Sequence, residues 1–260
     1  MSEATPATIE RLSRRTGIAP DYIRDRLGPP APGHGPGPAP ALLADEAMIE
    51  RVLVQETSFF RHAAQWTLLG SLLRDGSTFP ARPLQVWSAG CATGEEVWSL
   101  AYLLQSLGSG ASRILGSDIS PTAIRIAARG TYTRLEAMGS FRDLPEFARD
   151  AFPRRSGESW SAPASLRSMV RFEVHNLLDP VPAALEGHPA DLVFCRNLLI
   201  YFTEAATSQA LARLAGAMRK GAILVLGAAE SMRPTALFEP LEAAGATVWR
   251  RTAAAAGTGA

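Results

Sequence analysis

The stretch Leu84–Leu107, LQVWSAGCATGEEVWSLAYLLQSL, constrains the fold of this 260-residue chain more than any other. It begins with a short apolar run that favours a strand, and then passes through a loop at 88–94 that contains two glycines. After the loop, apolar residues recur at helical spacing, at Val97, Leu100, Ala101, Leu104 and Leu107. A strand, a glycine loop and a helix in this order form the opening unit of a nucleotide-type binding site.

Two carboxylates at the start of that helix, Glu95 and Glu96, narrow the class of ligand. In dinucleotide-binding sites the positive helix N-terminus faces a pyrophosphate, which two carboxylates would repel. They suit a ligand with an amino group and no phosphate, such as S-adenosylmethionine (SAM). The spacing Gly90-x-x-x-Gly94 also departs from the G-x-G-x-x-G of dehydrogenases, which disfavours a dinucleotide oxidoreductase. Acidic first turns stabilise helices by themselves, so a purely structural role stays open.

The composition excludes several classes of function. A formal net charge of +1 argues against bulk electrostatic binding to nucleic acid or to an anionic membrane. No apolar run approaches the roughly 20 residues of a membrane span, and the N-terminus lacks the apolar core of a signal peptide. We therefore expect a cytoplasmic protein without membrane insertion, and a monomer. The two cysteines and four histidines lack metal-ligand spacing, so no metal site is expected.

A second acidic residue follows the next strand of the pattern. The strand at Arg113–Ser117 ends in Asp118, which suits hydrogen bonds to ribose hydroxyls. Taken alone, Asp118 is equally suited to cap the helix at Ser120–Arg129. Further strands at 169–174, 191–195, 222–226 and 247–250, with a helix at 204–219, complete an alternating pattern. This alternation predicts an open, mostly parallel α/β sheet that binds ligands at the carboxyl ends of its strands.

The chain is expected to divide into four parts. Residues 1–27 form a short N-terminal helical module whose mixed charge suits either a solvated face or a docking surface for a partner. Residues 28–40 are almost entirely Gly, Pro and Ala, which predicts an extended linker. Residues 41–252 form the main domain, interrupted by an inserted subdomain at about 134–172. Residues 253–260 are expected to be a disordered tail.

Five segments occur along the main domain in a distinctive order. They are QETSFFR at 55–61, WSAGCATGEEVWSLA at 87–101, SDISPTAIRIAARGTY at 117–132, VHNLLDP at 174–180 and DLVFCRNLLIYF at 191–202, with GAAES following at 227–231. In this order they resemble the CheR-type chemotaxis receptor methyltransferases, which are protein-glutamate O-methyltransferases. The resemblance implies a class I SAM-dependent methyltransferase fold, which is Rossmann-like and mostly parallel with an antiparallel last strand. It also implies that the insertion is antiparallel.

The resemblance further implies a set of SAM-binding residues, carried over by position. They are Gln55, Thr57, Arg61, Gly90, Glu95, Asp118, Asn176, Leu177, Arg196 and Asn197. In this assignment Glu95 accepts a hydrogen bond from the methionine amino group and Asp118 accepts from the ribose hydroxyls. Asn176 and Leu177 hold the adenine. The methionine end is oriented by Thr57 and Asn197.

The implied catalytic residues are Arg61 and Tyr201, which would lie nearest the transferred methyl group. The reaction would transfer the methyl group of SAM to glutamate side chains in the cytoplasmic helical region of a chemoreceptor, for sensory adaptation. It would leave S-adenosylhomocysteine (SAH). A glutamate with a pKa of about 4.3 is already ionised at neutral pH, so no general base is needed. The planar fork of Arg61 matches a carboxylate of the substrate or of the cofactor, and Tyr201 would fix the sulfonium or the acceptor oxygen.

Some departures from the family pattern leave alternatives open. Gln55 stands where the family usually has Asn, and the N-terminal helical domain, which helps to engage the receptor in the family, is shortened here. The chain could instead methylate another protein or a small molecule. It could also be a SAM-binding regulatory module with weak or no turnover.

Overall fold

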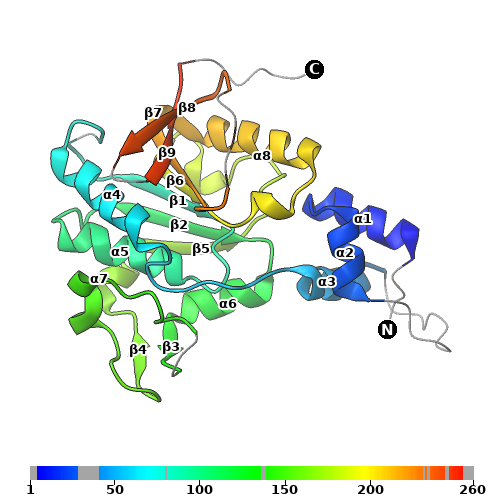
Figure 1. Ribbon diagram of the computed structural model, residues 1–260, viewed down its shortest axis with the longest axis horizontal. Helices are drawn as coiled ribbons and strands as arrows, with labels where there is room; N and C mark the ends of the chain where they lie inside the picture. Colours follow the sequence, from blue (N-terminus) through cyan, green and yellow to red (C-terminus); the bar gives the residue numbers. More distant parts are fainter. Residues whose placement is uncertain are drawn as a thin grey trace.

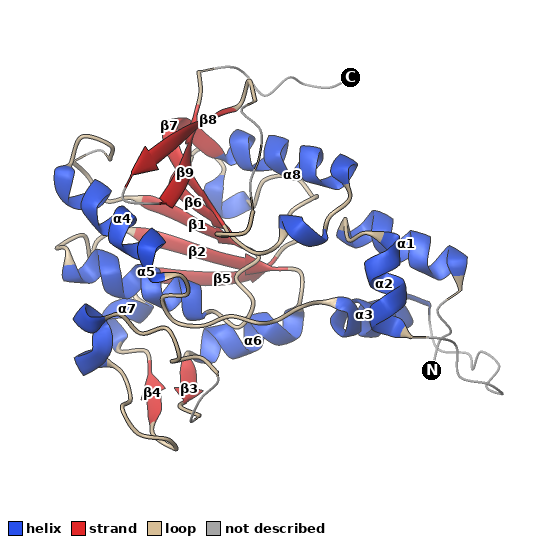
Figure 2. Cartoon of the chain, in the orientation of Figure 1, coloured by secondary structure: helices blue, strands red, loops and turns tan. Residues whose placement is uncertain are grey.

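The computed structural model describes residues 5–28, 41–79, 81–135, 139–230, 232, 235–243 and 246–253. Most of the expected linker at 28–40, nearly all of the expected tail at 253–260, and Ser231 of the GAAES segment lie outside these ranges. The described chain is built around one large twisted sheet with helices on both faces, and a group of three helices stands at one side (Figures 1 and 2).

The large sheet has seven strands among the described residues, in the order β5-β2-β1-β6-β7-β9-β8. Their bounds are β1 Gln85–Ala89, β2 Arg113–Asp118, β5 Val170–Val174, β6 Ala190–Cys195, β7 Met218–Leu226, β8 Phe238–Ala243 and β9 Ala246–Arg251. The first five pair in parallel, whereas β9 runs antiparallel to both β7 and β8. This confirms the predicted fold class, including the antiparallel last strand.

Helices cover both faces of this sheet. The helices α4 (Ala63–Asp75) and α5 (Glu95–Ser106) supply apolar side chains to the core on one face, and α8 (Glu204–Ala217) supplies the core on the other face. The helix α6 (Pro121–Arg129) is capped by Ser120, whose hydroxyl accepts a hydrogen bond from the Ala123 N–H at 2.9 Å. Because Ser120 caps this helix, Asp118 is not needed as its cap.

Two parts of the sheet differ from the sequence prediction. The helix expected to reach residue 219 ends at Ala217, and β7 begins at Met218. The strand β8 was not predicted at all. Its sequence FEPLEA contains a proline and two glutamates, which are unfavourable in a central strand. Among the described residues it forms the edge of the sheet and pairs with β9 alone, and an edge strand tolerates a proline.

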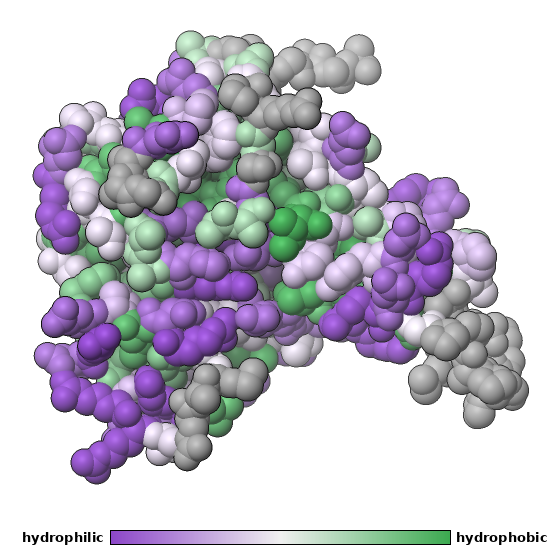
Figure 3. Space-filling view, in the orientation of Figure 1, coloured by the Kyte–Doolittle hydropathy of each residue, from purple (hydrophilic) through white to green (hydrophobic). Residues whose placement is uncertain are grey.

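The inserted segment carries a second, two-stranded sheet, in which β3 (Thr131–Thr133) pairs antiparallel with β4 (Ser159–Ser161). It also contains the 3-10 helix η1 (Glu146–Ala151) and the short helix α7 (Ala164–Arg167). The insertion therefore begins at 131, earlier than the expected 134, and the residues from 170 onward belong to the large sheet. Hydrophilic side chains gather over this part of the molecule on the face shown in Figure 3.

The N-terminal module is larger than expected. The helix α3 (Ala41–Val52), which the sequence placed in the main domain, packs with α1 (Pro6–Thr16) and α2 (Pro20–Leu27). Their shared apolar core contains Ile9, Leu12, Ile18, Ile23, Met48, Ile49 and Val52. The module also docks on the main domain, because the Ala19 N–H donates to the Tyr201 carbonyl at 2.8 Å and Ile18 bridges to Phe202. It is therefore part of the folded body.

A buried carboxylate at the start of β6 is expected to be important for stability. Asp191 is fully buried, forms ion pairs with Arg82 and Arg219, and accepts from the Gln85 N–H at 2.7 Å. We expect Asp191→Ala to lower the free energy of unfolding by about 1–3 kcal/mol, because the Gln85 N–H loses its acceptor and the partly exposed Arg82 and Arg219 lose their shared counter-charge. Denaturant unfolding measures the loss. Asp150→Ala, which removes an exposed ion pair with Arg154, is the control and should leave the unfolding midpoint unchanged. An equal loss in both variants would contradict the prediction.

Candidate active site

A cavity lies at the carboxyl ends of β1, β2 and β6, and the N-terminal module forms its opposite wall. The structure brings most of the predicted site residues together there. They are Gln55, Thr57, Arg61, Gly90, Asp118, Asn176, Leu177, Arg196, Asn197 and Tyr201. The cavity lining does not include Glu95.

The two glutamates at the start of α5 point to different surroundings. The carboxylate of Glu95 accepts hydrogen bonds from the Thr93 and Ser140 hydroxyls, at 2.7 and 2.6 Å, away from the cavity. Burial raises its pKa. Glu96, by contrast, lines the cavity. Successive residues on a helix point about 100° apart, so only one of the two can face the ligand. Of the two glutamates, Glu96 is the one whose side chain lines the cavity, and we propose that Glu96 meets the amino group of the ligand.

Glu96 is held in place by a buried arginine. Its carboxylate accepts from the Ser88 hydroxyl at 2.7 Å and from Arg196 Nη1 at 3.1 Å. Arg196 Nη2 donates to the Arg61 carbonyl at 2.7 Å, and the side chain of Arg196 is only 3% exposed. Its buried Nε has no hydrogen-bond partner in the described part of the chain. Burial lowers the pKa of Arg196, and the negative charge of Glu96 opposes this shift.

Asp118 lies at the carboxyl end of β2 and lines the cavity, as predicted. Its two oxygens accept from the Ser120 and Ala92 N–H groups, both at 2.9 Å. These bonds fix the direction of the carboxylate, while burial raises its pKa. Each oxygen retains accepting capacity, since a carboxylate oxygen has two lone pairs. The carboxylate of Asp118 is therefore suited to accept hydrogen bonds from two hydroxyl groups of a ligand.

Several loops at the cavity are held in left-handed backbone conformations. Ala92 has a φ of 46° and Asn197 a φ of 56°, although neither is glycine. Such residues cost on the order of 1 kcal/mol each and gather at functional sites. Gly90 has a φ of 77°, and a Cβ atom there would lie 2.9 Å from Leu198 Cδ2. The left-handed backbone favours glycine at this position, and the tip of Leu198 fills the space beside it.

Glu230 holds the loop that carries Asn197, a role that sequence reasoning missed. Its carboxylate accepts from the N–H groups of Asn197 at 2.7 Å, Leu198 at 2.9 Å and Ile200 at 3.2 Å, and from that of Gly227 at 2.6 Å. The GAAES segment was recognised as a family feature, but nothing in its spacing indicated this contact across 33 residues. Glu230 is a positioning residue for the loop between β6 and α8.

We expect Glu230→Gln to weaken SAM binding about 10-fold, because an amide cannot accept from all these donors and the loop loses charge-assisted hydrogen bonds. Isothermal titration with SAM and with SAH measures the change. Glu239→Gln, which removes an exposed charge paired with Arg250, is the matched control. Equal affinities for the variant, the control and the unmodified protein would contradict the positioning role.

The N-terminal module supplies a wall of the cavity that the sequence did not predict. Thr16, Ile18 and Tyr22 line it, and the Tyr22 ring packs on Tyr201 with centroids 4.9 Å apart. Asn176 Nδ2 donates to the Arg15 carbonyl at 2.6 Å, so an expected adenine-binding residue also anchors α1. Burial raises the pKa of Tyr201.

Gln55 follows the end of α3 by three residues and contacts this helix. Its Nε2 donates to Glu50 Oε2 at 3.0 Å and to the Ser120 hydroxyl at 3.1 Å. Gln55, which stands where the family usually has the shorter Asn, thus links the N-terminal module to the start of α6.

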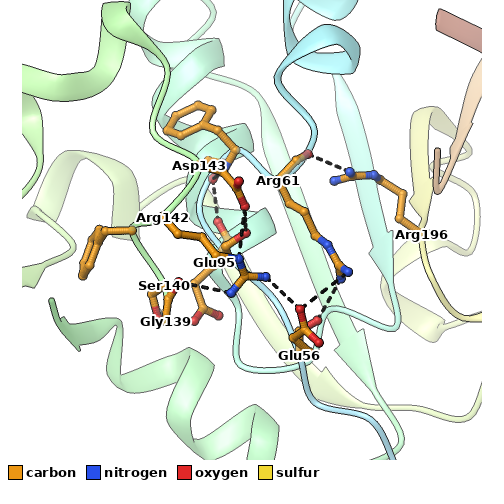
Figure 4. Close-up of polar contacts among 12 residues, drawn as sticks. Glu56, Arg61, Glu95, Gly139, Ser140, Arg142, Asp143 and Arg196 are labelled. Atoms are coloured by element: carbon orange, nitrogen blue, oxygen red, sulfur yellow. Dashed lines mark hydrogen bonds and ion pairs between the residues drawn. The ribbon is translucent and has the colours of Figure 1, made fainter. Parts of the chain in front are cut away.

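Arg61 lies at the mouth of the cavity and already contacts a carboxylate. Its Nη1 donates to the Glu56 carbonyl at 3.0 Å, and its Nη2 lies 3.8 Å from Glu56 Oε1 (Figure 4). The backbone carbonyl of Arg61 accepts from Arg196 and from Trp66 Nε1, which fixes the position of the main chain. The side chain is 24% exposed, so it is accessible to a second molecule.

Comparison with known proteins identifies this arrangement. A family model described as CheR methyltransferase, SAM binding domain, matches residues 55–246. The chain belongs to the CheR methyltransferase family. SAM is therefore the cofactor of this domain, which confirms the predicted cofactor. The cavity fits it, because Glu96 and Asp118 present fixed acceptors at the carboxyl ends of the strands, and Gly90 leaves room between two loops.

Relatives in this family carry two kinds of name. The chain is 38% identical over 193 residues to a "Probable biofilm formation methyltransferase WspC" of Pseudomonas putida, covering 72% of this chain and 44% of that protein. It is 32% identical over 198 residues to a "Chemotaxis protein methyltransferase" of Listeria innocua, covering 74% and 71%. The chain thus spans less than half the length of the first relative and about seven tenths of the second.

Among solved structures, the chain resembles the magnesium protoporphyrin IX methyltransferase of Synechocystis with bound SAM, at 15% identity and a TM-score of 0.43, covering 96% of this chain and 100% of that one. Within the described ranges, the helices are all too short or too polar to cross a membrane. The same ranges contain no group of three or more His, Cys, Asp or Glu residues that could hold a metal ion.

Proposed function

We propose that this protein transfers the methyl group of SAM to glutamate side-chain carboxylates of a cytoplasmic chemoreceptor region, giving glutamyl methyl esters and SAH. The observation that supports this most directly is Arg61, whose guanidinium stands at the cavity mouth beside a carboxylate. Relatives named chemotaxis protein methyltransferase support the same substrate class. We also propose a cytoplasmic location, because relatives with this name would act on the cytoplasmic region of a receptor.

SAM supplies a methyl group bonded to a positively charged sulfur. A carboxylate oxygen of the acceptor forms the new bond to that carbon while the carbon–sulfur bond breaks, and the electron pair passes to the sulfur. No proton moves, so the protein need not provide a base. The residues of the protein instead orient the reacting groups and exclude water from them. Arg61 holds a carboxylate in line with the methyl group, and Tyr201, packed on Tyr22, shields the site from water.

Base-labile labelling tests the proposal. Cytoplasmic receptor fragments from the same genome are incubated with the protein and SAM carrying a radioactive methyl group. We expect label that mild base releases as methanol, because esters hydrolyse whereas N-methyl groups do not. Fragments with glutamine at the labelled glutamates are the control. Base-stable label would favour another acceptor, and tight SAM binding without transfer to any fragment would favour a regulatory module.

A second candidate function is the same methyl transfer to a different receptor. Relatives in two Pseudomonas species, at 38% and 36% identity, are named as probable biofilm formation methyltransferases. The acceptor would then belong to a signalling system for surface growth. Labelling all receptor fragments of the genome in parallel distinguishes the two candidates by which fragment is methylated fastest.

A further inference from the structure

Glu56 lies between two arginines at the mouth of the cavity (Figure 4). Its Oε1 accepts from Arg142 Nη2 at 3.0 Å and lies 3.8 Å from Arg61 Nη2. Arg61 comes from the QETSFFR segment, whereas Arg142 comes from the inserted segment, 81 residues later in the chain. Two guanidinium groups from distant parts of the sequence thus converge on one carboxylate.

The inserted segment is firmly attached where it carries Arg142. The Phe59 N–H donates to the Ser140 carbonyl at 2.6 Å, and the Ser140 hydroxyl donates to Glu95 at 2.6 Å. The Ser58 hydroxyl donates to Asp143 Oδ2 at 2.6 Å. These three bonds fix the main chain on both sides of Arg142. They also give Glu95 a function, since it anchors the segment that presents this arginine.

The carboxylate of Glu56 is easily displaced from this position. Its side chain is 62% exposed, and exposed ion pairs contribute little, about 0–1 kcal/mol. The two arginines are more enclosed, with side chains 27% and 24% exposed. Arg142 also has a second acidic neighbour, Asp143, whose Oδ2 lies 3.4 Å from its Nε. Asp143 is held by Ser58, so Glu56 is the partner free to leave.

We propose that Arg142 and Arg61 together bind the carboxylate of the acceptor glutamate, and that Glu56 occupies this position until the acceptor displaces it. The inference rests on the proposed function, in which the acceptor is a glutamate side chain. Guanidinium groups match carboxylates in shape and charge, and two of them can hold one carboxylate between them. Arg142 does not line the SAM cavity itself, but it contacts Glu56, which does.

This role predicts which kinetic constant changes. The acceptor carboxylate loses its charge as the ester forms, so its contacts with Arg142 are no stronger in the transition state than in the ground state. Interactions of this kind lower KM without raising kcat. A purely structural role for Arg142 would instead disturb SAM binding or stability.

Kinetics of two variants test the inference. We expect Arg142→Gln to raise KM for the receptor fragment about 10-fold or more, with kcat and the Kd for SAM unchanged. We expect Glu56→Gln to lower KM about two- to five-fold, because the competing charge is gone. Arg155→Gln, an exposed arginine of the same inserted segment, is the matched control. An unchanged KM in Arg142→Gln, or a parallel loss of SAM affinity, would overturn the role of Arg142. An unchanged KM in Glu56→Gln would overturn that of Glu56.

A binding measurement separates this inference from the proposed function. N-acetyl-glutamate α-amide is titrated by NMR into the protein loaded with SAH, and the glutamine analogue is the neutral control. We expect the glutamate compound to bind better than the glutamine compound, and Arg142→Gln to abolish the difference. If this holds but no receptor fragment is methylated, the proposed substrate is wrong and the arginine pair stands. If receptors are methylated but the difference persists in Arg142→Gln, the inference is wrong and the function stands.

Discussion

Replacing Glu96 with glutamine is expected to weaken SAM binding about 10- to 100-fold, whereas the same change at the adjacent Glu95 should alter it less than about three-fold. Glu96 lines the cavity and is fixed by Ser88 and Arg196. A glutamine there loses the negative charge that meets the amino group of the ligand. Glu95 faces Thr93 and Ser140, so its loss does not remove a group from the cavity.

Glu96→Gln should also destabilise the fold, by about 3–5 kcal/mol, because it leaves the buried guanidinium of Arg196 without its counter-charge. Titration calorimetry with SAM measures the first effect, and denaturant unfolding in the absence of SAM measures the second. Glu95→Gln is the matched control for both charge and position on the helix. Its expected defect is a raised KM for the acceptor, since it loosens Ser140 beside Arg142. If Glu95→Gln weakened SAM binding more than Glu96→Gln did, the positions of the two side chains would be misassigned.

The contrast between these neighbours shows where sequence reasoning reached its limit. The strand, the glycine loop and the helix were predicted correctly, because apolar periodicity and glycine positions are local signals. The direction of each glutamate depends on partners far away in the sequence. Ser140 lies 45 residues after Glu95, and Arg196 lies 100 residues after Glu96. No local pattern reports such contacts, so the resemblance assigned Glu95 to the ligand, whereas the structure lines the cavity with Glu96.

The N-terminal module illustrates the same limit. A helical module at 1–27 was predicted, but the Gly/Pro-rich stretch at 28–40 suggested separation from the main domain. The structure instead places α3 in the same small core and sets Tyr22 against Tyr201. The contacts that decide this are a backbone bridge at Ile18 and a carbonyl at Arg15, which the sequence of a helix does not reveal. The place of Asp118 at the carboxyl end of β2 was predicted, because it depends only on where one strand ends.

Arg61→Ala is expected to lower kcat/KM for methyl transfer about 1000-fold, equivalent to about 4 kcal/mol, while the fold stays intact. Among the described residues, the hydrogen bond and the ion pair of this side chain both go to Glu56, through its carbonyl and its carboxylate. The contacts that hold the loop, from Arg196 and Trp66, go to the backbone carbonyl of Arg61, which the substitution retains. The loss should therefore come from the missing guanidinium and not from a collapsed site.

Arg61→Lys sharpens this prediction, because lysine keeps the charge but lacks the planar fork. We expect it to recover only part of the activity, about 10-fold above the alanine variant. Kinetics with the receptor fragment and SAM binding are measured on both variants. If Arg61 binds the acceptor carboxylate, the Kd for SAM stays near that of the unmodified protein. If it binds the cofactor carboxylate instead, the Kd rises along with the loss of activity. Full activity of Arg61→Ala would contradict the assignment of Arg61 to the active site. It would also contradict the proposed role of the arginine pair around Glu56.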